Sequence, residues 1–271
     1  MNRRSAPLRI GIAGAGAIGA SLARALDGGI DGLLLTAMAA RDNAAARARL
    51  PLTHDCVFTD FAGLARSCEV IVECAPAALL PDIARPALGA GRELVVLSAG
   101  ALLRHMDLID LAREHGARII VPTGALIGLD AVTAAAEGKI HSVRMITKKP
   151  VKGLVGAPYL AEHGIAIEDI REPLCVFRGS ARDAARGFPA NLNVAVALSL
   201  AGIGPDRTLL EIWADPAATR NNHRIEVDAD AASFSMEIHN VPSENPRTGK
   251  ITALSVLACL RKMTAPLRVG T

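Results

Sequence analysis

The sequence predicts an α/β protein with a doubly wound parallel sheet, followed by a second α+β domain whose sheet is mixed or antiparallel. Two observations predict this fold class. Apolar strand-like runs alternate with helical segments up to about residue 121, which is the pattern of βαβ units with right-handed crossovers. Beyond about residue 126 the strand-like segments alternate polar and apolar side chains, as half-exposed strands do.

A glycine-rich turn lies between the first strand and the first helix. Residues 8–12 read as a short apolar strand, and residues 20–26 continue with helical spacing. The intervening G-x-G-x-x-G spacing allows a tight turn, a close approach of backbone to a pyrophosphate, and close packing of helix on strand. Helix N-terminal N–H groups would bind the phosphates. An ordinary tight turn is the alternative, but the context favours a Rossmann-type domain that binds NAD or NADP through Gly14, Gly16, Ala17, Ile18 and Gly19.

The remainder of this domain continues the alternation. Further strands are expected at 33–39, 69–75, 93–98 and 118–121, and helices at 61–68, 81–90 and 106–115. Ligands of such sheets bind at the carboxyl ends of the strands. We therefore expect the loops that follow three of these strands to contact the coenzyme, through Ala75, Pro76, Ser98 and the segment that starts at Pro122.

Two charged residues follow the second strand, where this fold reads the ribose of the coenzyme. An acid at this place favours the 2′-hydroxyl of NAD, and an arginine accommodates the 2′-phosphate of NADP. The sequence offers both, as Arg41 and Asp42. The choice between NAD and NADP therefore stays open, and two solvated loop charges are the alternative interpretation.

The second domain is expected over residues 126–244. Alternating strands are predicted at 142–147, 208–214 and 233–239, with another strand at 224–227 between the last two and an apolar helix at 191–201. A final apolar helix, 251–263, follows a turn-like segment. We expect the chain from 245 to 271 to return to the first domain, so that residues 1–125 and 245–271 form the dinucleotide-binding domain.

Composition narrows the functional classes. The chain has 271 residues, of which 51% are hydrophobic and 21% charged, so a sizeable core is expected and disorder is not. Its net charge of +3 is too small and too dispersed to indicate nucleic-acid binding. Five cysteines without a C-x-x-C pair suit free thiols in a reducing compartment. The sequence shows no signal peptide, membrane span or metal-ligand pattern, so we expect a cytoplasmic protein without a catalytic metal.

Several polar residues of the second domain are candidates for substrate chemistry. His223 lies in the polar stretch 219–225 just before a predicted strand, and its unperturbed pKa of about 6.5 suits a general acid or base; a surface loop residue is the alternative. Lys148 and Lys149 end a strand and could bind a dianionic substrate, or could simply be exposed there. Asn191 and Asn193 start a helix, where Asn191 could be an N-cap or a ligand contact.

Taken together, these segments resemble the L-aspartate dehydrogenase family over nearly the whole chain. The glycine motif is common to many dehydrogenases, but the later motifs are much more specific in this order and spacing. They read Val-Pro-Thr-Gly-Ala125, Thr-Lys-Lys-Pro150, Phe-Pro-Ala-Asn-Leu-Asn-Val194, Asn-Asn-His223 and Asn-Val-Pro-Ser-Glu-Asn-Pro246. The family pattern has one lysine, or an arginine and a lysine, before the proline, so the cation that meets the substrate stays open between Lys148 and Lys149.

The resemblance implies NAD(P)-dependent oxidation of L-aspartate to iminoaspartate, which either hydrolyses to oxaloacetate and ammonia or feeds NAD biosynthesis. It implies that His223 is the active-site residue, that Ala125 and Asn191 contact the coenzyme, and that the protein is a homodimer using its second domain. We add Asn222, beside His223, to the substrate-binding candidates, and Arg178 and Arg224 as further carboxylate clamps. Two alternatives remain: another amino-acid or carbonyl reductase, similar to dihydrodipicolinate reductase or homoserine dehydrogenase, or a dinucleotide-binding regulator without turnover.

Overall fold

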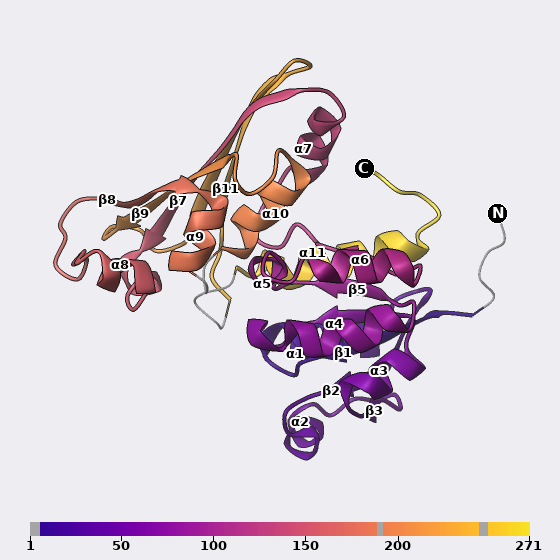
Figure 1. Cartoon of the computed structure of the whole chain (residues 1–271). Coiled ribbons are helices and arrows are strands. Elements are labelled where there is room, and N and C mark those ends of the chain that lie inside the picture. Colours follow the sequence, from indigo (N-terminus) through magenta and orange to yellow (C-terminus); the bar gives the residue numbers. More distant parts are fainter. Residues whose placement is uncertain (1–5, 189–191, 244–248) are drawn as a thin grey trace. The chain divides into compact units, whose positions relative to one another are not determined.

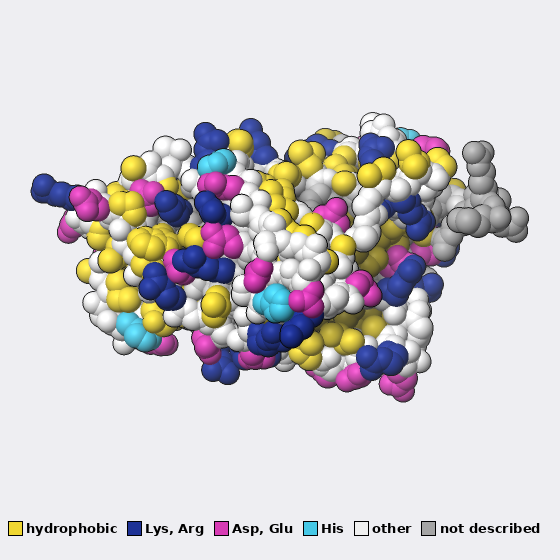
Figure 2. Space-filling view, turned by 90° about the horizontal axis from the view of Figure 1, so that it is seen from above, with side chains coloured by type: hydrophobic (Ala, Val, Ile, Leu, Met, Phe, Trp, Pro, Cys, Tyr) yellow, Lys and Arg dark blue, Asp and Glu magenta, His cyan; other side chains and the backbone are white. Residues whose placement is uncertain are grey.

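The computed structural model describes residues 6–188, 192–243 and 249–271. The chain divides into two compact units (Figure 1). The first comprises the chain up to Pro122 together with Ala253–Arg268, and the second comprises Thr123–Thr252 with Val269–Thr271. None of the described helices is long and apolar enough to cross a lipid bilayer. Basic and acidic side chains are intermixed on the face shown in Figure 2.

The first unit contains a six-stranded parallel sheet in the order β3-β2-β1-β4-β5-β6. This is the doubly wound order of a dinucleotide-binding sheet, in which the order of strand addition reverses between β1 and β4. The sequence prediction of this fold class is confirmed. The pattern missed only β3, a strand of two residues, among the strands of this sheet, which are β1 (Leu8–Ala13), β2 (Leu33–Ala39), β3 (Val57–Phe58), β4 (Val70–Glu73), β5 (Glu93–Val96) and β6 (Arg118–Ile120).

Helices cover this sheet because its strands are apolar on both faces. Ile10, Ile12 and Val72 are fully buried, and α11 contributes the fully buried Val256 and Leu260 to the same core. The last helix therefore belongs to the packing of the first unit. The helices here are α1 (Ala17–Asp27), α2 (Asn43–Arg49), α3 (Phe61–Ser67), α4 (Leu80–Gly89), α5 (Ala99–Leu102), α6 (Asp107–Glu114) and α11 (Ile251–Thr264), with a 3-10 turn η1 (Ala77–Leu79).

The second unit contains a five-stranded mixed sheet in the order β11-β10-β7-β9-β8. Only β7 and β9 run parallel, and the other neighbours are antiparallel, as predicted for this domain. The strands are β7 (Ile140–Pro150), β8 (Leu174–Ser180), β9 (Thr208–Asp215), β10 (Asn222–Ala229) and β11 (Ser233–His239). The helical segments are α7 (Leu129–Ala136), η2 (Val151–Gly153), α8 (Pro158–Glu162), α9 (Ala181–Gly187) and α10 (Asn193–Ala201).

The two faces of this sheet differ, and the difference positions the candidate site. Along β7, Val143, Met145, Thr147 and Lys149 are buried, whereas the intervening Lys148 is exposed. Successive side chains of a strand point to opposite faces, and α9 and α10 pack against β9 on one of them (Figure 1). We call the face that carries the buried set the inner face, and the opposite one the outer face.

Two of the predicted boundaries affect candidate site residues and are corrected by the structure. The predicted strand 224–227 is longer, because Asn222–Ala229 pairs with β7 on one side and β11 on the other. The predicted helix 191–201 begins only at Asn193, with Leu192 in the N-cap position. Asn191 itself lies outside the described residues.

Candidate functional site

The glycine turn of the first unit has the geometry of a phosphate site. Gly14 has φ 113°, and a Cβ placed there would lie 2.5 Å from the carbonyl oxygen of Cys74. A Cβ at Gly19 would collide with the carbonyl oxygen of Gly14, so this glycine allows α1 to pack against the turn. Both positions require glycine for packing within the protein. The turn therefore requires glycine at positions 14 and 19.

Gly16 differs from its two neighbours in the motif. It is exposed and occupies the N-cap of α1 without a side-chain cap, and a Cβ there would meet no atom of the protein within 4 Å. The exposed Ala17 and half-buried Ile18 follow in the first turn of the helix. Open space in front of helix N-terminal N–H groups fits the pyrophosphate of a dinucleotide. The residues present thus fit NAD or NADP.

The predicted ribose-binding pair lies between β2 and α2. Both Arg41 and Asp42 are exposed. Oδ1 of Asp42 accepts a hydrogen bond from the backbone N–H of Ala45 at 2.9 Å and so caps α2. Asp42 therefore has a structural role, and Arg41 offers a positive charge next to it.

A buried carboxylate joins the two loops predicted to contact the coenzyme. Glu73, the last residue of β4, is fully buried. Its Oε2 accepts hydrogen bonds from the backbone N–H groups of Leu97 at 3.1 Å and Ser98 at 2.8 Å, and its Oε1 accepts one from the Ser98 hydroxyl at 3.0 Å. Burial raises the pKa of Glu73, and these hydrogen bonds oppose that shift. The Ser98 hydroxyl thus contacts Glu73, while Ala75 and Pro76 stay accessible in the loop after β4.

His223 of the second unit lies in a strand and not in a surface loop, which corrects the alternative interpretation. It is the second residue of β10 and pairs with Thr147 of β7 and Ile238 of β11. Only 3% of the residue is exposed. Its Nδ1 lies 3.1 Å from Oγ1 of Thr147, in hydrogen-bond contact. This contact fixes the ring and leaves Nε2 as the nitrogen available to a ligand.

The environment of this histidine keeps its imidazole neutral. Burial and the positive charge of Lys149 lower the pKa of His223 to about 3. Lys149 is 4% exposed, and burial lowers its pKa to about 8. The pKa of His223 thus lies well below the unperturbed value of 6.5, because a buried imidazole loses the solvation of its charged form.

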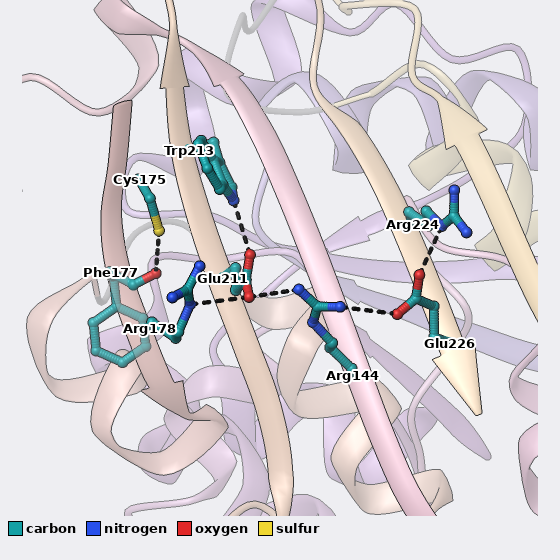
Figure 3. Close-up of polar contacts among 8 residues, drawn as sticks. All are labelled: Arg144, Cys175, Phe177, Arg178, Glu211, Trp213, Arg224 and Glu226. Carbon is teal, nitrogen blue, oxygen red and sulfur yellow. Dashed lines mark hydrogen bonds and ion pairs between the residues drawn. The ribbon is translucent and has the colours of Figure 1, made fainter. Parts of the chain in front are cut away.

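The structure separates the cations that the sequence proposed as carboxylate clamps. Lys149 shares the inner face with His223, whereas Lys148 is exposed on the outer face. Arg178 and Arg224 also lie on the outer face, in ion pairs of 3.0 Å with Glu211 and Glu226 (Figure 3). We therefore keep Lys149 in the candidate site and leave Lys148, Arg178 and Arg224 out of it.

The predicted asparagines and Ala125 have separate places in the second unit. Asn222 pairs opposite Lys148, and its Oδ1 lies 3.0 Å from Nδ1 of His239. Asn193 is exposed at the start of α10. The carbonyl of Ala125 accepts a hydrogen bond of 2.9 Å from the side chain of the buried Asn240. Asn240 begins the Asn-Val-Pro-Ser motif, so one function of that motif is to hold the segment at Ala125.

Comparisons with known proteins agree with the division into a dinucleotide-binding unit and a second unit. The model of the homoserine dehydrogenase NAD-binding domain matches residues 14–122, and the aspartate dehydrogenase C-terminal model matches residues 130–263. An L-aspartate dehydrogenase of Bradyrhizobium diazoefficiens is 58% identical, over 98% of this chain and 95% of its own. L-aspartate dehydrogenase 3 of Bordetella bronchiseptica is 56% identical, over 97% of this chain and 98% of its own. The chain belongs to the L-aspartate dehydrogenase family.

The fold of this aspartate dehydrogenase family member also matches solved structures. The crystal structure of aspartate dehydrogenase from Thermotoga maritima has a TM-score of 0.74 at 23% identity, with 97% of this chain and 99% of that chain covered. Scyllo-inositol dehydrogenase from Lactobacillus casei has a TM-score of 0.53 at 14% identity, with 97% and 87% covered. At these identities the likeness concerns the fold alone.

Three residues of this chain were missed as site residues from the sequence. Glu73 could have been found, because an acid that ends an apolar strand must meet donors when it is buried. Thr147 gave a weaker signal, since its place opposite His223 depends on the register of β7 and β10. Asn240 gave no signal in the sequence beyond its place in the Asn-Val-Pro-Ser motif.

Glu73→Gln tests the link between the two coenzyme loops. The amide would place an NH₂ donor where the Leu97 and Ser98 donors now meet carboxylate oxygens. We expect the free energy of unfolding to fall by about 1–3 kcal/mol and the KM for the coenzyme to rise several-fold. Steady-state kinetics and urea unfolding measure both. Glu69→Gln, which changes a solvent-accessible ion pair with Arg9 near the other end of β4, is the control; equal effects of the two variants would contradict the proposed link.

Proposed function

We propose that this protein catalyses the NAD(P)-dependent oxidative deamination of L-aspartate to iminoaspartate, which water converts to oxaloacetate and ammonia. The observation that supports this most strongly is the identity of 58% to an L-aspartate dehydrogenase over nearly the full length of both chains. The second support is the buried group of His223, Thr147 and Lys149 on one face of the second unit.

The chemistry needs groups that move protons and bind carboxylates. Bound NAD(P) supplies the hydride acceptor. The substrate ammonium group must lose a proton before its α-carbon can give up a hydride, and water must later lose a proton as it adds to the imine. Burial keeps the His223 imidazole neutral, so it can accept the proton that water loses as it adds to the imine. Lys149 is the basic side chain next to it, and Thr147 orients the ring through the contact at Nδ1.

Most of the coenzyme-binding residues of this proposal belong to the glycine turn and the loops of the first unit. The resemblance adds Ala125 of the second unit and Asn191, which lies outside the described residues. Gly14, Gly16 and Gly19 shape the turn, and Ala17 and Ile18 offer backbone N–H groups at the start of α1. Arg41, Asp42, Ala75, Pro76 and Ser98 surround the carboxyl ends of β2, β4 and β5.

A substrate panel tests the activity. Purified protein is incubated with NAD⁺ or NADP⁺ and, in parallel, with L-aspartate, L-glutamate, L-alanine or L-homoserine, while NAD(P)H absorbance and released ammonium are followed. We expect reduced coenzyme and ammonium in equal amounts with L-aspartate. Turnover of another amino acid with no signal from aspartate would favour a different amino-acid dehydrogenase. No reduction of coenzyme with any substrate, although the coenzyme binds, would favour a regulator.

We further propose that two copies associate through the outer face of the five-stranded sheet. This face carries Leu209, which is 51% exposed, and the partly exposed Ile146 and Trp213. Ion pairs among the neighbouring charged side chains order the rest of this face. Oε1 of Glu211 accepts hydrogen bonds from Arg144 at 2.7 Å and from Arg178 at 3.0 Å (Figure 3). Apolar side chains between ordered polar groups suit a protein–protein interface.

Leu209→Asp should convert the protein into monomers, because it places a charge in the apolar part of this face. Light scattering after gel filtration measures the mass. Trp213 is the single tryptophan, so its fluorescence should shift to longer wavelength as it becomes solvated. Val57→Asp, at a residue that is 59% exposed on the first unit, is the control. A Leu209→Asp protein with the wild-type mass and emission would argue against this interface.

The five cysteines of the chain are free thiols. Cys68 is buried, and the other four are partly exposed. Free thiols suit a reducing compartment, and this supports the proposal that the enzyme works in the cytoplasm.

A further inference from the structure

The inner face of β7 and β10 places a second titratable side chain beside His223. Thr147 is the direct partner of His223 across the two strands, and Lys149 follows two residues later on the same face. Such diagonal neighbours on a sheet are separated by about 7–8 Å, which is within reach of a long side chain. The charge of Lys149 also acts on the His223 ring. The amine and the imidazole therefore belong to one local group.

The surroundings of Lys149 on this face are largely apolar. β9 presents Ile212 and Ala214, both fully buried, and Ala214 is the register partner of Lys149. β10 presents His223. The small side chain of Ala214 leaves room for the lysine stem. A lysine that is 4% exposed in such surroundings loses solvation of its charge, and a group of this kind next to a histidine is a candidate for proton transfer.

We propose that Lys149, as a neutral amine, accepts the proton of the substrate ammonium group, and that this step precedes hydride loss from the α-carbon. This inference rests on the proposed oxidation of L-aspartate. The Nζ lone pair takes one proton, so that the substrate becomes a neutral amine and Lys149 an ammonium. Deprotonation leaves a lone pair on the substrate nitrogen, and this lone pair forms the C=N bond as the α-carbon loses a hydride. A bound NAD(P)⁺ would supply the acceptor for that hydride. His223 remains available for the water that adds to this bond.

The acid–base balance of the two groups supports this division. An imidazole with a pKa of about 3 is a weak acceptor for an ammonium proton, and efficient transfer requires an acceptor whose pKa is closer to the working pH. The pKa of Lys149, about 8, meets that requirement. Below this pH Lys149 keeps its own proton and cannot accept another. We therefore expect kcat/KM for L-aspartate to rise as the pH increases through about 8.

Four proteins test the assignment: wild type, Lys149→Met, Lys149→Arg and Lys149→Ala. We expect kcat to fall about 100-fold or more in each variant and the rise through pH 8 to disappear. Arginine keeps the positive charge but does not release its proton, so a purely structural or carboxylate-binding lysine would be rescued by it. Ethylamine added to Lys149→Ala should restore part of the activity, increasingly at higher pH.

Lys148→Met is the matched control, because this neighbour lies on the outer face and we have left it out of the site. It should keep the wild-type pH profile. A readout independent of turnover is NMR of protein labelled with 13Cε-lysine, in which the resonance absent from Lys149→Met should titrate near pH 8.

The outcomes separate the two proposals. If the wild type oxidises aspartate and Lys149→Arg keeps the wild-type pH profile, the proton-transfer role of Lys149 is overturned. The proposed function would still stand. A lysine resonance that titrates near pH 10.5, the ordinary value for lysine, would also overturn that role. Absence of aspartate-dependent NAD(P)H in the wild type would overturn the proposed function, and the proton-transfer role with it.

Discussion

Replacing His223 with asparagine should lower kcat for L-aspartate oxidation by about 100- to 10,000-fold, the usual range for loss of a positioned acid–base group. Asparagine can still meet the Thr147 hydroxyl, which contacts the imidazole at 3.1 Å, but it cannot take a proton. The variant should fold, since the side chain it loses is neutral and is replaced by a smaller polar one. Steady-state kinetics across the pH range and thermal unfolding measure the two effects.

His141→Asn is the control for this substitution. His141 lies on β7 but is exposed, and its Nε2 pairs with Asp230 at 2.6 Å. We expect this variant to retain wild-type kcat within about two-fold, as surface ion pairs contribute little. A His223→Asn enzyme with near-wild-type kcat at every pH would remove the acid–base role from the histidine.

Gly16→Ala should weaken coenzyme binding at least tenfold, a loss of about 1.4 kcal/mol, without a comparable loss of stability. The backbone at Gly16 has φ −74°, which alanine adopts freely, and its Cβ would meet no protein atom within 4 Å. A methyl group at this position therefore collides with nothing except a ligand. The pyrophosphate of the coenzyme is the group that this motif brings closest to the second glycine. Fluorescence titration with NADH and a thermal melt measure affinity and stability separately.

Gly89→Ala provides the matched control, because a Cβ at Gly89 also meets nothing within 4 Å and the residue ends α4. It should leave NADH affinity unchanged. Gly19→Ala should instead destabilise the protein, since its Cβ collides with the Gly14 carbonyl. If Gly16→Ala bound NADH as tightly as the wild type, the phosphates would not lie against this turn.

The first unit was predictable because its signals are local. Its parallel strands are continuous apolar runs, and the glycine turn depends on sterics within a few residues. Strands were missed where contacts between distant parts of the chain determine the structure, or where the strand is very short. β8 was missed because the register shifts between Cys175 and Phe177, which breaks the alternation of side chains. β3 has only two residues, Val57 and Phe58, too few for a period.

The candidate site shows the same division between local and distant causes. His223 could be selected by its residue type and motif, but its burial depends on β7 and β11, which flank it from other parts of the chain. Two adjacent lysines predict that one side chain points to each face of a strand. Which face is covered depends on helices more than 30 residues away in sequence, α9 (Ala181–Gly187) and α10 (Asn193–Ala201), so burial of Lys149 could not be foreseen.

Transfer of deuterium from L-[2-²H]aspartate to the coenzyme tests whether the α-hydrogen of the substrate leaves as a hydride. The reaction is run with NAD⁺ in ordinary water, and the product NADH is analysed by NMR and mass spectrometry. We expect one deuterium at C4 of the nicotinamide ring for each ammonium released, and a slower rate than with unlabelled aspartate if hydride transfer limits turnover. Reduced coenzyme without deuterium, or ammonium released without reduced coenzyme, would contradict it.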